Sequence, residues 1–531
     1  MGQRPKLYDF NAERESIIET VCRRTVAEKV MEANEGRGAQ LEYILNEAAF
    51  HEIERLVKYG ADEAVGEVGN LGFWRSVARR VGTAGEGEKR RLLEDIVRSY
   101  GQDVAGNFDP RVYEVSNKVL PVALSLLFSA QGGSGGVRFR KLSDRIVFEG
   151  DLGLLRSLAS KGTFIVAPTH LSNLDSPVIG WALAEAGLPP VTYGAGKNLF
   201  TNALLSFFMH NLGAYKVDRR IAHNLYKDCL KNYSEELLMR GYHSLFFPGG
   251  TRSRSGHVES HLKLGLLGTG LTAAVRKLEM GRRDKTFIVP MTLNFSLVLE
   301  ADGLINDYMR TVGRQYYLLP DDPFDSPMEV ARFVTKLAAL ETSMVIRFGE
   351  PMDILGHRVD AEGQSYDARG RRVDPERFFE VRPGVIGHDA ARDREYTRQT
   401  GQALVEALHR NTVIMPTQFV SYLLFEAACR RFPKLDLARV LRFGRDLHVP
   451  WDEVNAEGAK VLQQLIEAQA QGKIRLLGPL TSRTVPEIVD LGLADLGKYH
   501  AVTAAEPTGQ GVRLNNMNLL CYYGNRLRCV L

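Results

Sequence analysis

A histidine and an aspartate lie five positions apart in PTHLSNLDS, residues 168–176. The imidazole of His170 can accept a proton from a reacting hydroxyl, and the carboxylate of Asp175 can orient and stabilise that imidazole, as in serine-hydrolase triads. The spacing alone is weak, because HNLYKD repeats it at His223 and Asp228. His223 lies in a charged helical stretch with no strand before it, so we expect a solvated surface residue. His170 follows the apolar run TFIVAP, and we predict that it is the general base.

A second segment, FFPGGTRSRSG at 246–256, places two arginines around a serine after a Pro-Gly-Gly bend. Alternate residues of an extended turn point the same way, so Arg252 and Arg254 would present two guanidiniums on one side. Guanidiniums fit phosphate, which accepts bidentate hydrogen bonds from arginine. Gly249 and Gly250 allow the backbone to approach a ligand closely, and with Thr251 they form the predicted substrate loop. The alternative is a pair of surface arginines in salt bridges.

Three further segments carry candidates for the same site. LGAYKVDRR, residues 212–220, contains Arg219, and HLKLGLLGTG contains Lys263 as another basic candidate. TFIVPMTLNF, residues 286–295, has the pattern of a buried strand. There Pro290 is expected to interrupt strand pairing and shape the wall of an acyl pocket.

The elements that must position these residues are indicated by a change of pattern along the chain. Between about 140 and 350, short apolar β-branched runs alternate with amphipathic stretches of helical length. Such alternation predicts an α/β fold with a mostly parallel sheet, in which ligands gather beyond the carboxyl ends of the strands. His170 follows one such run, and the Pro-Gly-Gly bend follows another. If the two strands are near neighbours, Arg252 and Arg254 come beside His170.

The flanking regions differ from this α/β pattern. We expect a helical N-terminal domain at 1–135, the α/β domain at 136–356, a polar surface insertion at 357–398 and a mainly helical C-terminal region at 399–531. The glycine-rich stretch AQGGSGGVRF, residues 130–139, reads as a linker.

Composition excludes several classes of function. The net charge of +4 is too small for bulk binding of nucleic acid, so no nucleic-acid partner is expected. Five scattered cysteines without a CxxC pair suit a reducing compartment and predict neither a disulfide framework nor a metal site. The first ten residues lack the apolar run of a signal peptide. The apolar stretches Val119–Ala130 and Leu199–Tyr215 are too short or too interrupted to span a bilayer, and either could lie in the membrane interface or be buried.

Four segments together resemble a known family. PTHLSNLDS, LGAYKVDRR, FPGGTRSRSG and IVPMTLNFS, in this order and at these separations, resemble the four acyltransferase blocks of the glycerolipid acyltransferase superfamily. The bacterial membrane-type glycerol-3-phosphate acyltransferases are the most similar. The likeness extends over most of the chain, through NFDPRVYEVSNKVLP before the blocks to MNLLCYYGNRL near the end.

The resemblance implies that 136–356 is an acyltransferase domain. Its reaction would move a fatty acyl group from acyl-CoA or acyl-carrier protein to the sn-1 hydroxyl of glycerol 3-phosphate, giving lysophosphatidate. His170, polarised by Asp175, would take the hydroxyl proton, and Arg252 and Arg254 would hold the phosphate, with Arg219 and Lys263 as further candidates. No covalent acyl-enzyme, cofactor or metal is expected. The implied location is the cytoplasmic face of the cell membrane, as a peripheral or monotopic protein.

One departure from the family concerns Gly249, where many members carry glutamate. That carboxylate could hydrogen-bond the acceptor hydroxyl or order the arginines, so the identity of the acceptor stays open. Dihydroxyacetone phosphate and lysophosphatidate are alternative acceptors. A catalytically inactive, membrane-associated phosphate-binding homologue is a further alternative, although the retained His170 and Asp175 count against it.

Overall fold

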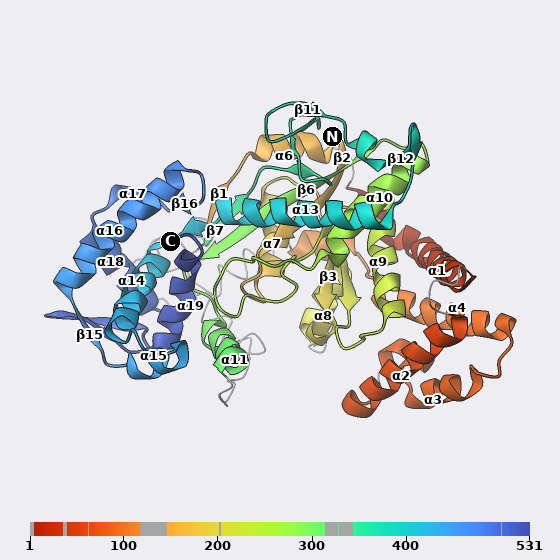
Figure 1. Ribbon diagram of the computed structural model, residues 1–531, viewed down its shortest axis with the longest axis horizontal. Helices are drawn as coiled ribbons and strands as arrows, with labels where there is room; N and C mark the ends of the chain where they lie inside the picture. The colour runs from red at the N-terminus through yellow and green to blue at the C-terminus, as the bar shows by residue number, and fades with distance from the viewer. Residues whose placement is uncertain are drawn as a thin grey trace.

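The computed structural model describes residues 5–34, 40–61, 63–116, 146–200, 203–313, 328, 344–500 and 502–531. The expected linker at 130–139 and the apolar stretch Val119–Ala130 lie outside the described residues. Figure 1 shows a central sheet with helical regions on either side of it.

Five parallel strands form one side of this sheet and include one of its edge strands. They run in the order β6 (Lys285–Phe295), β2 (Gly162–Pro168), β5 (Ser244–Leu245), β3 (Thr192–Gly196) and β4 (Ala214–Val217). β2 reads GTFIVAP and is buried from its second residue onward, as expected for a parallel strand covered on both faces. The predicted α/β fold with a mostly parallel sheet is therefore confirmed. Because β2 and β5 are parallel, hydrogen-bonded neighbours, the segments that follow them meet at the carboxyl ends of the strands.

Antiparallel strands extend the sheet beyond β6. β7 (Met344–Phe348) and β8 (Met352–Asp353) both pair with β6, and β1 (Ile146–Glu149) pairs with β7. Pairing of β6 with β2 continues through Pro290, so this proline does not interrupt it. On its other side, β6 pairs with β8 up to Ile288 and with β7 from Met291 onward. Between them, the carbonyl of Pro290 accepts a hydrogen bond from the amide of Gly349 at 2.8 Å. The proline thus occupies a gap between two partners, where no N–H is needed.

The segment predicted as a polar surface insertion contributes to the edge of the same sheet. β9 (Arg358–Val359), β10 (Ser365–Tyr366) and β11 (Arg372–Val373) continue it beyond β8. They are followed by η6 (Pro375–Phe379) and the small hairpin of β12 (Glu380–Arg382) and β13 (Val385–Ile386).

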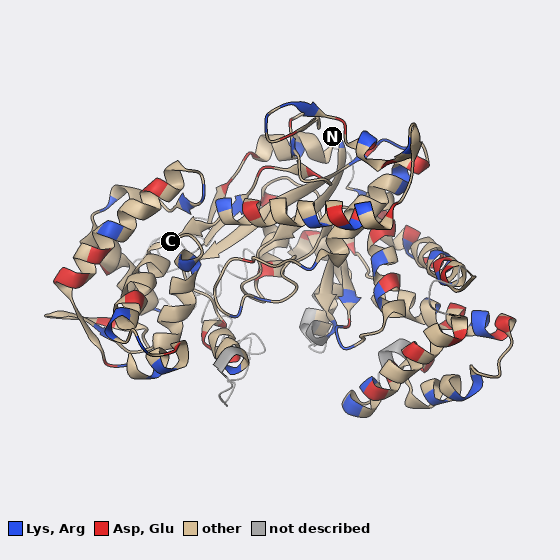
Figure 2. Cartoon of the chain, viewed as in Figure 1, with Lys and Arg blue, Asp and Glu red and all other residues tan. Residues whose placement is uncertain are grey.

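Helices cover both faces of the sheet. Those within the α/β region are α6 (Leu152–Ala159), α7 (Asp175–Glu185), η4 (Lys197–Phe200), α8 (Ala203–Asn211), α9 (Asn224–Met239), α10 (Leu264–Glu279) and α11 (Ala301–Gly313). In Figure 1, α13 (Ala390–Arg410) crosses in front of the sheet beside α10, and Figure 2 shows acidic and basic residues interspersed along it. Such a mixed row is typical of a solvated helix face.

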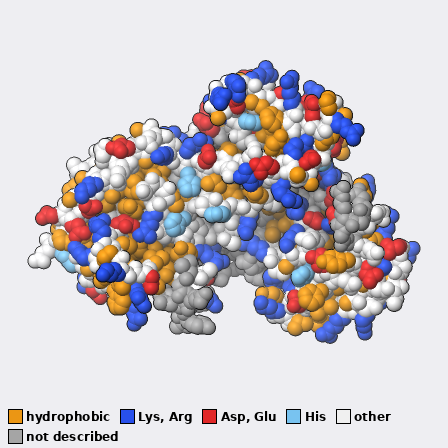
Figure 3. Space-filling view, viewed as in Figure 1, with side chains coloured by type: hydrophobic (Ala, Val, Ile, Leu, Met, Phe, Trp, Pro, Cys, Tyr) orange, Lys and Arg blue, Asp and Glu red, His pale blue; other side chains and the backbone are white. Residues whose placement is uncertain are grey.

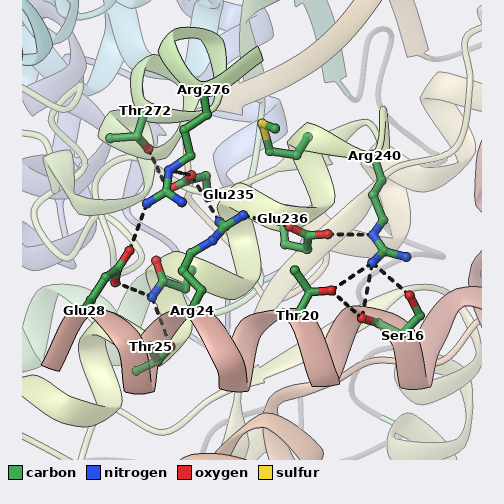
Figure 4. A network of polar contacts seen from close by, with 12 residues as sticks. Ser16, Thr20, Arg24, Thr25, Glu28, Glu235, Glu236, Arg240, Thr272 and Arg276 are labelled. Carbon is green, nitrogen blue, oxygen red and sulfur yellow. Dashed lines mark hydrogen bonds and ion pairs between the residues drawn. The ribbon is translucent and has the colours of Figure 1, made fainter. Parts of the chain in front are cut away.

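The N-terminal region is helical, as the sequence predicts. Its elements are η1 (Lys6–Asp9), α1 (Phe10–Asn34), α2 (Leu41–Tyr59), η2 (Glu63–Gly69), α3 (Leu71–Arg80) and α4 (Glu86–Val104). Its core is continuous with buried side chains of α9, including Tyr226 and Tyr233. Polar contacts join it to the sheet-covering helices (Figure 4): Arg24 donates to Glu235 at 3.1 Å, and Arg276 donates to Glu28 at 2.8 Å. These helices and the α/β region therefore share one packed interface.

The surface position expected for His223 is wrong. His223 is 1% exposed and precedes α9, where its Nδ1 accepts from the amide of Tyr226 at 3.4 Å. Its Nε2 lies 3.1 Å from the hydroxyl of Tyr100 on α4. The charged sequence around His223 hides this role, because the partners come from helices more than a hundred residues earlier. Asp228 instead pairs with Lys29 at 2.7 Å, so His223 and Asp228 form no dyad.

The C-terminal region packs against the α/β region through a shared hydrophobic core. It contains β14 (Val413–Ile414), α14 (Pro416–Arg431), α15 (Leu437–Phe443), β15 (His448–Pro450), α16 (Trp451–Ala470), β16 (Arg475–Leu476), α17 (Pro479–Ser482), α18 (Val485–Leu496), β17 (Ala505–Thr508), β18 (Gly511–Leu514) and α19 (Met517–Arg528). Helix α19 packs against α14 and reaches the α/β region, where the hydroxyl of Tyr523 accepts from the amide of Val298 at 3.0 Å.

The surface carries charges of both signs. On the face drawn in Figure 3, basic and acidic side chains are interspersed with apolar ones, in keeping with the small net charge. None of the described helices combines enough length with enough apolar residues to cross a bilayer.

Candidate functional site

His170 and Asp175 lie in direct contact at the carboxyl end of β2. The Nδ1 atom of His170 is 2.8 Å from Oδ2 of Asp175, whose side chain is fully buried. An ionised carboxylate only accepts hydrogen bonds, so this contact favours the tautomer that has the proton on Nδ1 and the lone pair on Nε2. The His170 side chain remains 14% exposed. This is the arrangement that a general base with an orienting carboxylate requires.

The start of α7 fixes the aspartate. Asp175 is the first residue of that helix, and its Oδ2 also accepts the amides of Leu171 at 2.6 Å and Ser172 at 3.0 Å. A carboxylate at a helix N-terminus is stabilised by the helix dipole and by the unpaired amides there. The loop after β2 therefore wraps around one oxygen, which holds the carboxylate toward the imidazole.

The segment after β5 holds the same histidine from another side. The ring of Phe247 stacks on the imidazole, and the amide of Ser253 donates to the carbonyl of His170 at 2.8 Å. The amide of His170 donates to Oε1 of Glu259 at 2.8 Å. Ring and backbone of the histidine are thus both held by the loop that carries the arginines.

A cavity of about 220 Å³ opens beside the dyad. Its lining includes His170, Phe247, Thr251, Arg219, Arg252 and Arg254. The sequence places these residues in three separate segments, and the parallel order of the strands brings all three to one sheet edge. The predicted base and the predicted phosphate ligands therefore share one cavity.

The three arginines of the cavity differ in their partners. Arg252 donates to Oε1 of Glu300 at 3.1 Å, and Arg254 pairs with Asp307 at 2.9 Å. Arg219 is exposed and makes no ion pair or hydrogen bond with any part of the chain that the structure describes. An uncommitted guanidinium at the wall of a cavity is available for an anionic ligand.

Five predicted residues lie outside the cavity lining: Asp175, Gly249, Gly250, Lys263 and Pro290. Lys263 packs its side chain over Gly250, where φ is +76°, and its amide donates to the carbonyl of Pro248 at 2.7 Å. Lys263 thus supports the loop from behind. Pro290 is buried within β6, and Gly249 faces Glu259. Of the predicted substrate loop, Thr251 reaches the cavity.

Glu300 is a residue of the site that the sequence reasoning missed. It is 3% exposed and accepts from the hydroxyl of Ser172 at 2.7 Å and the amide of Asn173 at 2.9 Å, in addition to Arg252. Glu300 therefore connects the loop of the dyad to an arginine of the cavity. It follows the apolar run of β6, and that position beyond a strand is the signal that could have identified it.

Comparison with known proteins gives one family match and a similarity to a solved structure. Residues 152–294 match the family described as Acyltransferase, so this part of the chain is an acyltransferase domain. Among solved structures, the chain is similar to the 1-acyl-sn-glycerophosphate (LPA) acyltransferase PlsC from Thermotoga maritima, with 15% sequence identity and a TM-score of 0.26. That similarity covers 68% of this chain and 94% of the other.

Proposed function

We propose that this protein transfers a fatty acyl group from acyl-CoA or acyl-carrier protein to the sn-1 hydroxyl of glycerol 3-phosphate, giving lysophosphatidate. One observation carries the proposal: the His170–Asp175 pair and three guanidiniums surround a single cavity within an acyltransferase domain. A base and an anion site in one cavity suit an acceptor that bears both a hydroxyl and a phosphate.

In the proposed reaction, Nε2 of His170 takes the proton of the acceptor hydroxyl. The resulting oxygen attacks the carbonyl carbon of the thioester, forming the ester C–O bond, and the C–S bond then breaks. The thiolate that leaves takes the proton from the imidazolium, which restores the neutral histidine. Asp175 keeps Nδ1 protonated and stabilises the positive charge that forms on the ring. Positioning and general base catalysis suffice, with no acyl-enzyme intermediate.

The dimensions of the cavity favour a small acceptor. Its volume of about 220 Å³ is below the range of about 300–1,000 Å³ typical of drug-sized ligand sites. Arg219 and Arg252 would bind the phosphate, and Arg254, which is paired with Asp307, would lie beside them. Glycerol 3-phosphate has no acyl chain of its own. Lysophosphatidate does, and that chain would have to be accommodated outside this cavity.

We place the protein at the cytoplasmic face of the membrane as a peripheral or monotopic protein. The lipid product supports this location, since it must leave into a bilayer. The exposed Phe207 on α8 also supports it, because that helix belongs to the apolar stretch Leu199–Tyr215.

A paired-acceptor assay tests the function. The purified protein is given palmitoyl-CoA or palmitoyl-acyl-carrier protein with glycerol 3-phosphate, dihydroxyacetone phosphate or lysophosphatidate in turn. The highest kcat/KM is expected with glycerol 3-phosphate. Preferred turnover of another acceptor would reassign the substrate. No turnover with any acceptor, together with retained binding of glycerol 3-phosphate by calorimetry, would identify an inactive phosphate-binding homologue.

A further inference from the structure

We propose that Glu259 is a positioning residue for the acyl transfer, and that position 249 is glycine because a side chain there would displace it. The inference rests on the proposed function, since it assigns to Glu259 the support of the general base. It also accounts for Gly249, which stands where many members of the family that the sequence resembles carry glutamate.

The space above Gly249 is already filled. A Cβ atom on Gly249 would lie 2.8 Å from Cγ of Glu259 and 3.5 Å from its Oε1. Carbon atoms that are not bonded approach to about 3.5–4.0 Å, so a residue larger than glycine would push Glu259 out of place. The contact is with the Cγ atom of Glu259, which is bonded to the carboxyl carbon, so a shift of Cγ also shifts the carboxylate.

The carboxylate of Glu259 serves the backbone of the general base. Its Oε1 accepts the amide of His170 at 2.8 Å. The amide and carbonyl of His170 are both bonded to the segment 253–259, as the contact of the carbonyl with Ser253 shows. A displacement of about 1 Å in a reacting group can cost on the order of a hundredfold in rate. Fixing the main chain of His170 is therefore a direct way to fix the position of Nε2.

A buried arginine from the C-terminal region acts electrostatically on this carboxylate. Arg526 on α19 is 2% exposed; burial lowers its pKa, and the negative charges of Glu259 and Asp175 act against that fall. Burial raises the pKa of Glu259, while the charge of Arg526 and the amide of His170 act against that rise. Helix α19 is held against the same segment, because Asn525 donates to the carbonyl of Ser255 at 2.8 Å. The C-terminal helix thus supports the loop that supports the base.

Two alanine variants and their combination test the proposal. Glu259→Ala removes the acceptor and is expected to lower kcat by about tenfold or more, with the KM for glycerol 3-phosphate changed less than about twofold. Gly249→Ala is expected to give a similar loss, because it displaces the same carboxylate. In the double variant the new Cβ no longer meets a glutamate, so the two losses should not multiply. Glu259→Gln keeps an oxygen acceptor and should retain most of the activity.

The matched control is Gly265→Ala in α10, where a Cβ would meet nothing within 4 Å, and it should leave kcat unchanged. Deuterium exchange of the peptide around His170 gives a readout independent of turnover, and the amide of His170 should exchange faster in Glu259→Ala. A folded Glu259→Ala with wild-type kcat and unchanged exchange would overturn the proposal, as would multiplying losses in the double variant. Failure of the wild-type protein to turn over would instead refute the proposed function.

Discussion

The imidazole of His170 stacks on the ring of Phe247, with the ring centroids 3.9 Å apart and the planes inclined by 20°. His170 follows β2 and Phe247 follows β5, which are neighbouring strands of the parallel sheet. Stacking restrains the face of the imidazole, and the contact of Nδ1 with Asp175 restrains its edge. The orientation of the base is therefore set by the pairing of two strands rather than by one loop alone.

Replacing His170 by alanine should lower kcat by about a hundredfold or more, the usual scale for removal of a general base. The melting temperature should change little, because the side chain lies at the wall of a cavity. The comparison is His223→Ala, which removes a buried hydrogen bond and should cost about 1–3 kcal/mol of stability while leaving kcat per folded molecule unchanged. An inactive but folded His223→Ala beside an active His170→Ala would assign the general base to His223 instead.

Replacing Arg219 by alanine should raise the KM for glycerol 3-phosphate by about tenfold or more, since a hydrogen bond to a charged group contributes about 1.5–3 kcal/mol. The neighbouring Arg220 provides the matched control, because it pairs with Asp218 at 2.6 Å and does not line the cavity. Initial rates at varied acceptor concentration measure both variants. Equal KM values for Arg219→Ala and the wild type would remove Arg219 from the phosphate site.

Replacing Glu300 by glutamine should raise the acceptor KM more than it lowers kcat. The change removes the negative charge that orients Arg252 but keeps an acceptor for the hydroxyl of Ser172. Adding Arg252→Ala to Glu300→Gln should cost less than Arg252→Ala costs alone, because residues in contact are not additive. Additive effects in this cycle would mean that Glu300 does not act through Arg252.

Stability should depend on pH through His243, which precedes β5. Burial, with a smaller effect of the Lys277 charge, lowers the pKa of His243 to about 4, and its Nδ1 accepts the amide of Phe164 at 2.9 Å. Between pH 6.5 and 4 the unfolded chain binds a proton that the folded chain does not. Stability should therefore fall by about 3 kcal/mol as the pH drops through this window. Urea unfolding of His243→Asn should show a smaller pH dependence there, and an unchanged dependence would contradict the assignment.

Phe207→Ser should weaken attachment to membranes. Phe207 is 52% exposed on α8, and burial of a phenylalanine side chain in an apolar phase contributes about 1.5–3 kcal/mol. Partition onto anionic vesicles, measured by flotation, is expected to fall about tenfold. Phe443→Ser is the control, since Phe443 is 56% exposed on α15 in the C-terminal region. Equal losses for both variants would argue against a contact specific to α8.

The fold and the meeting of distant segments could be predicted because they follow from local patterns. TFIVAP marks a buried strand, and the carboxyl end of that strand fixes where His170 stands. The roles assigned to His170, Asp175 and the arginines remain predictions. The burial of His223 could not be predicted, because its partners come from α4 and α2. Glu259 lies in a polar loop without periodicity, so its contact with His170 becomes apparent only when the loop is folded.

Helix α19 has a consequence for how this protein can be divided. Tyr522 places its carbonyl so close to Gly256 that a Cβ there would lie 2.0 Å away, and Asn525 bonds the same loop. Glu300 and α19 both lie beyond residue 294, where the match to the acyltransferase family ends. A fragment excised at that boundary would keep the histidine and the arginines but lose Glu300 and Asp307, which pair with Arg252 and Arg254, and the helix that supports the loop. The smallest unit able to preserve the geometry of this site is larger than the segment by which the family is recognised.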